Sequence, residues 1–283
     1  MILNIQAPAK INLWLEVIRK REDGYHDLSS LMLPVSVFDQ VSLRIRPEGG
    51  PVTLSCGSPE APSDERNLAW KAADLFRSTS GIDAGIHIDL EKRIPSGAGL
   101  GGGSSDAGSI LAALNAHFGK PIADKELEKL ACGIGADVPF FLHSRPALAT
   151  GIGERLEFAG GVPAFPLLLI KPPINVPTAW VYRNLKLTRG LPQITLSDLN
   201  AQPLRFEDFI ANDLESVTVS AHPVIAELKD WLLGHGALAA SMSGSGPTVF
   251  GIFPSNGAAL SAGTLANEVW RDCWVRAAEV IGT

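Results

Sequence analysis

The residues between positions 94 and 108 read IPSGAGLGGGSSDAG, with six glycines in fifteen positions. Glycine lets a backbone approach a ligand closely and turn successive N–H groups toward it. Ser104, Ser105 and Asp106 are residue types that open a helix, and a helix N-terminus carries free N–H donors and partial positive charge. We therefore predict that this glycine run binds an anion, most simply phosphate. The alternative is a flexible turn, which needs one or two glycines rather than six.

Two phosphate-binding motifs compete for this segment. The pattern G-x-x-x-x-G-K-[ST] is absent, because no Gly-Lys-Ser or Gly-Lys-Thr occurs in the chain. The dinucleotide pattern G-x-G-x-x-G is matched by Gly97, Gly99 and Gly102. That fold needs a continuously apolar strand before the glycines and a second strand after the helix. Here polar residues alternate with isoleucines before the run, and a second helix pattern follows the first, so dinucleotide binding is disfavoured.

Two charged residues stand in apolar surroundings. Lys10 lies in APAKINL, two residues before Asn12, and Asp137 precedes the apolar run VPFFL. A solvated strand lysine and an aspartate facing water are the simpler interpretations. A buried carboxylate must be paired or hydrogen-bonded.

Alternating and helical periodicities predict the elements that position these residues. Residues 9–18, 41–46 and 86–90 alternate as half-buried strands, the first with Lys10 and Asn12 on its polar face. Apolar stripes predict helices over residues 67–76, 107–118 and 124–132, with Gly119 at a helix end. The second half reads as strand 166–170, helices 206–217 and 223–233, a strand–turn–strand over 237–253, helix 258–270 and strand 274–280.

This order predicts an α+β fold, with antiparallel sheets and helices packed on them. The Gly- and Pro-rich stretch 149–166 is the expected joint between two domains. We place the boundary so that residues 1–155 form the first domain and residues 156–283 the second.

Length and charge exclude several classes of protein. The chain has 283 residues, a net charge of −6 and 46% hydrophobic residues, which suits a folded domain and gives no general attraction to nucleic acid or anionic lipid. Its three cysteines are far apart and lack a C-x-x-C spacing, which favours a reducing compartment and gives no zinc site. The first ten residues lack the features of a signal peptide, and no membrane span is expected. We therefore expect a cytoplasmic protein without nucleic-acid or membrane partners.

Three segments together resemble a known family. They are PAKINLWLEVIRKREDGYHDL at 8–28, PSGAGLGGGSSDAG at 95–108 and SMSGSGPTVFGIF at 241–253. Their order and spacing resemble the motifs of the GHMP kinases, named for galactokinase, homoserine kinase, mevalonate kinase and phosphomevalonate kinase. The GLGGGSSD form, with DGYH and GADVPFF, resembles the branch that acts on 4-diphosphocytidyl-2-C-methyl-D-erythritol. The resemblance spans nearly the whole chain, and two positions depart from its pattern: Gly108 stands where Ala is usual, and Ser96 lies inside the nucleotide loop.

The resemblance implies a fold, a reaction and a set of partners. The first domain would bind ATP, the second would lie on the substrate side, and a cleft would separate them. The product would be the 2-phosphate of the cytidine diphosphate sugar alcohol, plus ADP, in the non-mevalonate route to isoprenoid precursors. ATP chemistry needs a divalent cation, most simply Mg²⁺, which Ser104 or Ser105 could touch. No metal ligand set stands out, and the oligomeric state, monomer or homodimer, stays open.

The resemblance also assigns roles to single residues. Asp137 would act as the base or align the hydroxyl, while Lys10 would orient it and offset charge on the attacking oxygen. At roughly 4 Å the two charges would attract by about 4 kcal/mol at an effective dielectric near 20, which would keep Asp137 ionised and able to accept a proton. Substrate contacts would come from Asn12, from Tyr25 and Tyr182 stacking on the cytosine ring, from His26 and from Thr178. The turn SMSGSGP would support phosphates or the substrate tail through backbone donors; a plain hairpin is the alternative. The nucleotide would be held by Pro95, Ser96, Gly97, Ala98, Gly99, Leu100, Gly101, Gly102, Gly103, Ser104 and Ser105, with Asn67 and Lys92 on the adenine side.

For Asn67 and Lys92 the simpler interpretations are a helix N-cap and a surface lysine. For Tyr25 the simpler interpretation is an aromatic side chain that anchors a hairpin.

Other functions compete with this one. A different GHMP kinase would phosphorylate homoserine, mevalonate or a sugar, but the aromatic residues favour a substrate with a base. A catalytically silent nucleotide-binding protein would be favoured by loss of Lys10 or Asp137, and both are present. A serine hydrolase is disfavoured because the pattern G-x-S-x-G is absent.

Overall fold

The computed structural model describes residues 1–187, 195 and 209–282, which form two compact units. Unit 1 comprises Met1–Ala9, Val37–Ser96 and Gly101–Ser144, and unit 2 comprises Lys10–Ser36, Gly97–Leu100 and Arg145–Thr283. Helices and strands are mixed in both, which confirms the α+β class. Both units are built from segments far apart in the sequence. The predicted boundary between residues 155 and 156 divides the sequence into two family domains, which are not the same as these two units, and it stays a prediction.

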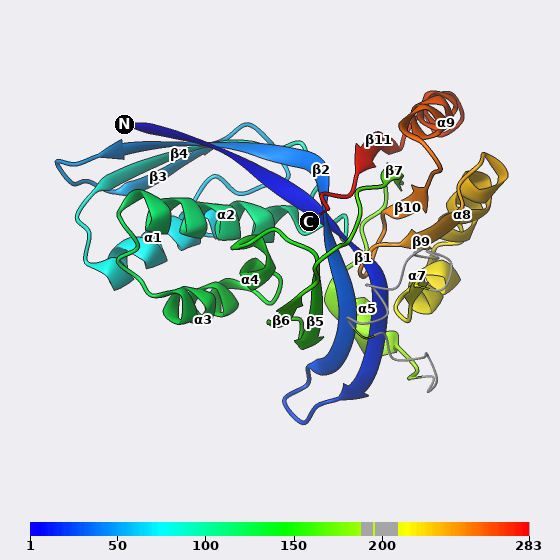
Figure 1. Cartoon of the computed structure of the whole chain (residues 1–283), viewed down its shortest axis with the longest axis horizontal. Helices are drawn as coiled ribbons and strands as arrows, with labels where there is room; N and C mark the ends of the chain where they lie inside the picture. Colours follow the sequence, from blue (N-terminus) through cyan, green and yellow to red (C-terminus); the bar gives the residue numbers. More distant parts are fainter. Residues whose placement is uncertain (188–194, 196–208, 283) are drawn as a thin grey trace. The chain divides into compact units, whose positions relative to one another are not determined.

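Unit 1 is a sheet covered by helices. Strand β4 (Gly85–Glu91) pairs antiparallel with the end of β2 (His26–Arg46) and parallel with β3 (Val52–Cys56), and the start of β1 (Ile2–Lys20) lies beyond β2. Figure 1 shows α1 (Leu68–Ser80) and α2 (Gly102–His117) against one face of this sheet, with α3 (Asp124–Ile134) and α4 (Val138–Phe141) beyond them. The apolar parity of β2 and β4 faces these helices, so the predicted alternation over 41–46 and 86–90 is confirmed.

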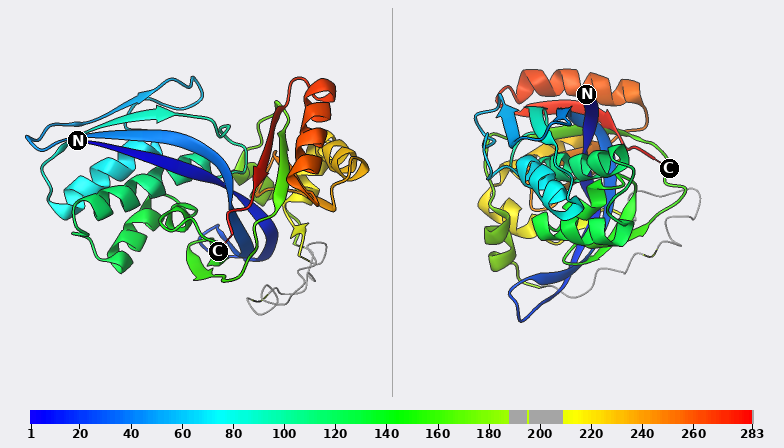
Figure 2. Two further views of the ribbon diagram at one scale, coloured as in Figure 1. Left: turned by 45° about the horizontal axis from the view of Figure 1, so that its top comes forward. Right: turned by 90° about the vertical axis from the view of Figure 1, so that its left-hand side faces the viewer.

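Unit 2 contains a second, four-stranded antiparallel sheet. Its order is β11 (Trp274–Glu279), β7 (Pro166–Lys171), β10 (Val249–Ile252) and β9 (Ala239–Met242). Helices α8 (Val224–Gly234) and α9 (Asn256–Val269) pack on it, as the left view of Figure 2 shows. The predicted strand–turn–strand over 237–253 is thus confirmed as β9 and β10.

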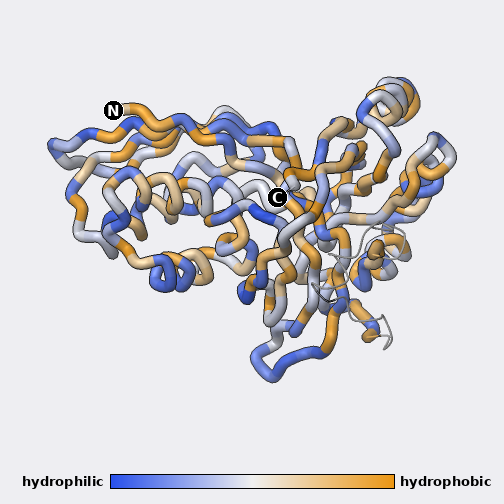
Figure 3. Tube along the Cα trace, in the orientation of Figure 1, coloured by the Kyte–Doolittle hydropathy of each residue, from blue (hydrophilic) through white to orange (hydrophobic). Residues whose placement is uncertain are grey.

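The remaining elements of unit 2 lie around β1 and β2. Strand β5 (Ala147–Gly151) pairs with β2 and with β6 (Arg155–Phe158), while β8 (Ala211–Asn212) pairs parallel with β1 at Trp14 and Leu15. Helices α5 (Thr178–Asn184) and α7 (Glu215–Ala221) complete the described part. The turn between β1 and β2 is strongly hydrophilic (Figure 3).

Two predictions about elements are wrong. The helix expected over 206–217 is instead strand β8 followed by α7 from Glu215, and residues 206–208 lie outside the described residues. The half-buried strand over 9–18 is buried on both faces through Leu15, because other segments of unit 2 cover its polar face. In the described ranges, no helix is both long enough and apolar enough to cross a membrane.

Candidate active site

The glycine run connects β4 to α2 through a backbone that needs glycine. Gly97, Gly99 and Gly101 have φ angles of 61°, 77° and 71°, in the left-handed region that side chains other than glycine rarely adopt. Gly101 is the N-cap of α2 and makes no side-chain cap bond. The prediction that residues 104–106 open the helix is therefore wrong, since the helix begins at Gly102 and these residues belong to its first two turns.

The start of α2 offers backbone donors. The N–H of Ser105 donates to the carbonyl of Gly101 at 2.8 Å, so the N–H groups of Gly102, Gly103 and Ser104 precede the first intrahelical bond. A Cβ at Gly103 would meet nothing nearer than 3.7 Å, so the surface there is open. The Ser105 hydroxyl is buried and donates to the carbonyl of Pro8 at 2.6 Å. Ser104 is left as the serine whose hydroxyl could touch a cation.

Lys92 lies in a buried ion-pair cluster rather than on the surface. Its side chain is 8% exposed; its ammonium pairs with Asp39 and lies 2.7 Å from Asp106. The other oxygen of Asp39 accepts the N–H groups of Arg93 at 2.5 Å and Ile94 at 2.8 Å. The interpretation of Lys92 as a surface lysine is wrong, and this cluster ties β2 to the start of the glycine run and to α2.

The cluster perturbs the ionisation of its members. Burial opposes the charge of Lys92, but the charges of Asp106 and Asp39 outweigh burial and raise its pKa. Burial raises the pKa of Asp106 to about 7, although the charge of Lys92 acts in the opposite direction. The Oδ1 atom of Asp106 is buried without a hydrogen-bond partner, which agrees with a carboxyl group that resists ionisation.

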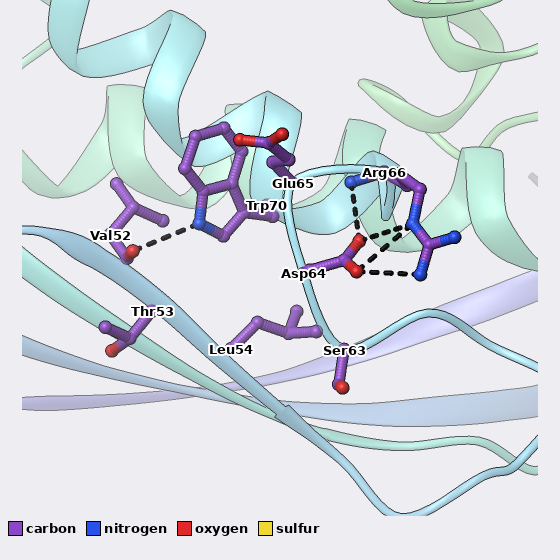
Figure 4. A pocket seen from close by; sticks show the side chains of 8 residues that line it. All are labelled: Val52, Thr53, Leu54, Ser63, Asp64, Glu65, Arg66 and Trp70. Atoms are coloured by element: carbon purple, nitrogen blue, oxygen red, sulfur yellow. Dashed lines mark hydrogen bonds and ion pairs between the residues drawn. The ribbon is translucent and has the colours of Figure 1, made fainter.

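Asn67 caps helix α1, as its simpler interpretation predicted. Its Oδ1 accepts the N–H of Ala69 at 2.9 Å, and its Nδ2 donates to the carbonyl of Pro62 at 2.7 Å. A cavity of about 420 Å³ lies beside the preceding loop, and Trp70 on its wall donates to the carbonyl of Val52 at 3.0 Å (Figure 4). Neither Asn67 nor Lys92 lines this cavity, so their role toward adenine stays a prediction.

Asp137 is positioned by tight packing between two helices. It is half-buried and occupies the N-cap position of the short helix α4. A Cβ at Gly108 in α2 would lie only 2.7 Å from Val138 O and from Phe141 Cβ. The glycine at this departure from the family pattern therefore lets α2 and α4 approach more closely than alanine permits.

Lys10 and Asn12 are brought together on the buried polar face of β1. Their side chains are in the protein interior, with residues 4% and 5% exposed, and Lys10 Nζ donates to Asn12 Oδ1 at 2.6 Å. Asn12 Nδ2 donates to the hydroxyl of Ser30 at 2.7 Å, which in turn donates to the carbonyl of Trp14. The backbone N–H of Lys10 also donates to the carbonyl of Leu100 at 3.0 Å. The amide of Asn12 thus fixes the ammonium next to the glycine run.

The turn between β9 and β10, residues 243–248, packs directly against the glycine run. The hydroxyl of Ser243 donates to the carbonyl of Gly99 at 3.0 Å, and the N–H of Thr248 donates to that of Ala98 at 3.3 Å. A Cβ at Gly99 would lie 2.2 Å from Ser243 O, so only glycine permits this approach. The turn is therefore more than a hairpin connection, although its contact with phosphates stays a prediction.

The structure brings His26 and Tyr182 together, whereas Tyr25 lies apart from them. The rings of His26 and Tyr182 are 5.1 Å apart and tilted by 31°, whereas Tyr25 is 60% exposed at the β1–β2 turn. Burial lowers the pKa of His26, and the charge of Lys20 acts in the same direction. Thr178, on the same helix as Tyr182, shares a hydrogen bond of 2.8 Å with Ser245 of the turn.

Two residues of the site were missed from the sequence. Asp39 lies on the same parity as the buried Val37 and Val41, and an acid on the apolar face of a strand must be paired. That signal was available. Asn212 donates to two carbonyls of the β9–β10 region, and no local pattern marks it.

Comparison with known proteins places this geometry in a family. The model of the GHMP kinase N-terminal domain matches residues 67–145, and that of the C-terminal domain matches residues 198–270. A curated 4-diphosphocytidyl-2-C-methyl-D-erythritol kinase from Geobacter sp. (strain M21) is 44% identical over 261 residues, covering 92% of each chain. The chain belongs to the GHMP kinases. It is accordingly an ATP-dependent kinase of small molecules.

Solved structures of GHMP kinases support the same fold. A crystal structure of 4-(cytidine 5'-diphospho)-2C-methyl-D-erythritol kinase has a TM-score of 0.82 and 36% identity, and the match covers 99% of this chain and 100% of that one. A homoserine kinase from Cytophaga hutchinsonii has a TM-score of 0.73 and 25% identity, with coverage of 99% and 95%. The two GHMP kinases have different alcohol substrates, so the fold alone does not select one.

Proposed function

We propose that this GHMP kinase transfers the γ-phosphoryl group of ATP to the 2-hydroxyl of 4-diphosphocytidyl-2-C-methyl-D-erythritol, a step toward isoprenoid precursors. The observation that carries the proposal is the 44% identity to a relative of that name along 92% of both chains. The structural similarity is also higher to the kinase of the cytidylyl alcohol than to the homoserine kinase, with TM-scores of 0.82 and 0.73.

The glycine run is suited to the triphosphate of ATP. Left-handed glycines turn the backbone at positions 97, 99 and 101, and the first N–H groups of α2 follow at once. Such donors bind phosphate oxygens without any basic side chain. We propose that Asn67, Pro95 and Ser96 line the adenine side. Lys92 would act there mainly by fixing this segment, because its ammonium is engaged by Asp39 and Asp106.

A divalent cation, most simply Mg²⁺, would accompany the phosphates. No group of three or more acidic, histidine or cysteine side chains that could hold a metal occurs in the part of the chain that the structure describes. The cation would therefore be held chiefly by phosphate oxygens and water, as Mg²⁺ prefers, with the hydroxyl of Ser104 as the protein contact. When bound, it neutralises charge on the transferred group.

Asp137 and Lys10 would carry the proton and the charge. We propose that the carboxylate of Asp137 takes the proton of the 2-hydroxyl as that oxygen attacks the γ-phosphorus and ADP leaves. The ammonium of Lys10 would stabilise negative charge on the attacking oxygen, and its bond to Asn12 holds it in one place. If the carboxylate only aligned the hydroxyl and took no proton, Asp137 would still be the residue that does so.

The cytosine ring would be recognised by His26 and the aromatic residues. A lowered pKa keeps His26 neutral near pH 7, so the imidazole offers one donor and one acceptor to the base. Tyr182 packs beside it and could stack on the ring, with the exposed Tyr25 as the second face and Thr178 as a polar contact. The cysteine pattern suits the reducing cytoplasm, where we place the reaction.

A substrate panel tests this function. ADP release from ATP and Mg²⁺ is measured with the cytidylyl alcohol, homoserine, mevalonate and galactose. We expect turnover with the cytidylyl alcohol only. The variant Asp137→Asn should lose at least about a hundredfold in kcat and still bind ATP, while Asp74→Asn, on the exposed face of α1, should match the unaltered enzyme. Turnover of a different alcohol would overturn the substrate assignment.

A further inference from the structure

The turn at residues 243–248 is the point where two parts of the proposed site meet within unit 2. Its Ser243 hydroxyl donates to Gly99 of the glycine run and lies 3.3 Å from the backbone N of Asn12, which donates to it. A Cβ at Gly244 would lie 3.2 Å from Asn12 Oδ1 and 3.4 Å from Lys10 Nζ. Whatever fixes this turn therefore also fixes Lys10 relative to residues 97–100.

Asn212 holds the start of the turn, while Thr178 and Thr218 bond to Ser245 further along it. The Nδ2 atom of Asn212 donates to the carbonyl of Met242 at 2.7 Å and to that of Gly244 at 2.8 Å. These two carbonyls flank Ser243, so one amide group fixes the backbone on both sides of the residue that contacts the glycine run. Its Oδ1 accepts the N–H of Leu214 at 3.0 Å, which orients the amide so that nitrogen, not oxygen, faces the turn.

The residues around Asn212 tie the same region to β1. Strand β8 pairs with Trp14 and Leu15, and Asp213 Oδ2 accepts the N–H of Val17 at 2.7 Å. Glu215 Oε2 accepts the N–H of Met242 at 2.9 Å and the hydroxyl of Ser241 at 3.1 Å. A short run of chain thus links the strand that carries Lys10 to the strand that leads into the turn.

We propose that Asn212 is a positioning residue for phosphoryl transfer, acting through the 243–248 turn on Lys10 and the phosphate-binding residues 97–100. The proposal rests on the proposed function for the identity of the alcohol and for the roles of Lys10 and residues 97–100. The hydrogen bonds of Asn212 go to the turn and to Leu214, and it sets the separation of the ammonium and the glycine run by holding the two carbonyls of the turn.

Asn212→Asp tests this role because it keeps the shape of the side chain. An ionised carboxylate would face two carbonyl oxygens with no proton to donate, and a protonated carboxyl would restore one of the two bonds. Near pH 8 we expect kcat to fall about tenfold and the Kd of a fluorescent ATP analogue to rise about fivefold, which lies within the range that the loss of two half-buried hydrogen bonds produces. Toward pH 6 both ratios to the unaltered enzyme should recover.

Charged neighbours are the same in both proteins, so the ratio isolates the new carboxyl. They are Asp213 and Glu215 on the same segment, Glu16 and Lys10 on β1, and Lys229 on α8. Asn267→Asp in α9 is the matched control, since its Nδ2 also donates to one backbone carbonyl, that of Gly263, at 2.8 Å. Its ratios should stay near one at both pH values.

The test of Asn212 can fail or succeed independently of the substrate panel. If a different alcohol is turned over, that alcohol serves in the assay, and the ATP analogue needs no alcohol at all. If Asn212→Asp does not fold, Asn212→Ser, which keeps one donor, should still lower kcat about fivefold. Activity and ATP affinity within about twofold of the unaltered enzyme, or losses that do not recover toward pH 6 in a folded Asn212→Asp, would overturn the proposal.

Discussion

Gly108→Ala is expected to destabilise unit 1 although it places a better helix former inside α2. In an open helix interior, alanine is favoured over glycine by about 1 kcal/mol. At position 108 the added Cβ would lie 2.7 Å from Val138 O and Phe141 Cβ, and 2.9 Å from Phe141 C. Two of these neighbours are backbone atoms of α4, which cannot rotate away, and overpacking of this kind costs typically about 1–3 kcal/mol. We expect a net loss of about 1 kcal/mol in the free energy of unfolding.

The same substitution should lower activity more than stability alone explains. Helix α4 spans only Val138–Phe141, and Asp137 immediately precedes it. Pushing α4 away from α2 therefore displaces the proposed catalytic carboxylate, and a displacement of about 1 Å can cost two orders of magnitude in rate. We expect kcat to fall by at least about tenfold in a protein that remains folded.

Urea denaturation and ADP release measure the two effects. Gly133→Ala in α3 is the matched control, because a Cβ there meets nothing within 4 Å. It should gain up to about 1 kcal/mol and keep its kcat. If Gly108→Ala instead raises the free energy of unfolding and leaves kcat unchanged, then the α2–α4 packing does not position Asp137.

Two other predictions concern the same segments. Because the pKa of Asp106 is raised to about 7 in the folded state, from about 3.9 in an unfolded chain, the folded state binds more protons between these values. The free energy of unfolding should therefore fall with rising pH in this window, by at most about 1.4 kcal/mol per pH unit. Urea titrations at several pH values should show that Asp106→Asn removes this dependence of the free energy of unfolding on pH. If the dependence is unchanged in the variant, Asp106 is not its cause. Gly99→Ala, whose Cβ would lie 2.2 Å from Ser243 O at a φ of 77°, should weaken ATP binding at least about tenfold. Calorimetric titration measures this, and unaltered affinity would refute the close approach of turn and glycine run.

The local elements around the site could be predicted because their cause is local. The alternation over 41–46 and 86–90 follows from a sheet with one apolar face, and the density of glycine at 97–103 follows from a backbone that needs positive φ at several positions. These patterns require no knowledge of what packs against them.

Features that depend on distant segments could not be predicted in this way. The polar face of β1 gave Lys10 and Asn12 the pattern of a solvated strand, yet residues more than 200 positions away cover them. Asn212 has no local signal, since its function is to satisfy two carbonyls that are distant in sequence. The start of α2 at Gly102 rather than at the serines reflects a backbone cap by Gly101, which propensities of capping side chains do not describe.

The ion-pair cluster is an intermediate case. An acid at position 39 on the apolar parity of β2 indicates a buried partner, but the sequence does not say which cation provides it. Lys92 provides it only because β2 and β4 are neighbours in the sheet.

The central claim is that Asp137 serves transfer from ATP to the 2-hydroxyl of the cytidylyl alcohol, and product identification tests it most directly. Phosphorus NMR of the reaction of the unaltered enzyme with ATP, Mg²⁺ and that alcohol should show a new phosphate monoester on carbon 2, formed in step with ADP. Asp137→Asn should bind ATP and form this product at least about a hundredfold more slowly. A monoester at another position, free phosphate alone, or full activity of Asp137→Asn would contradict the account.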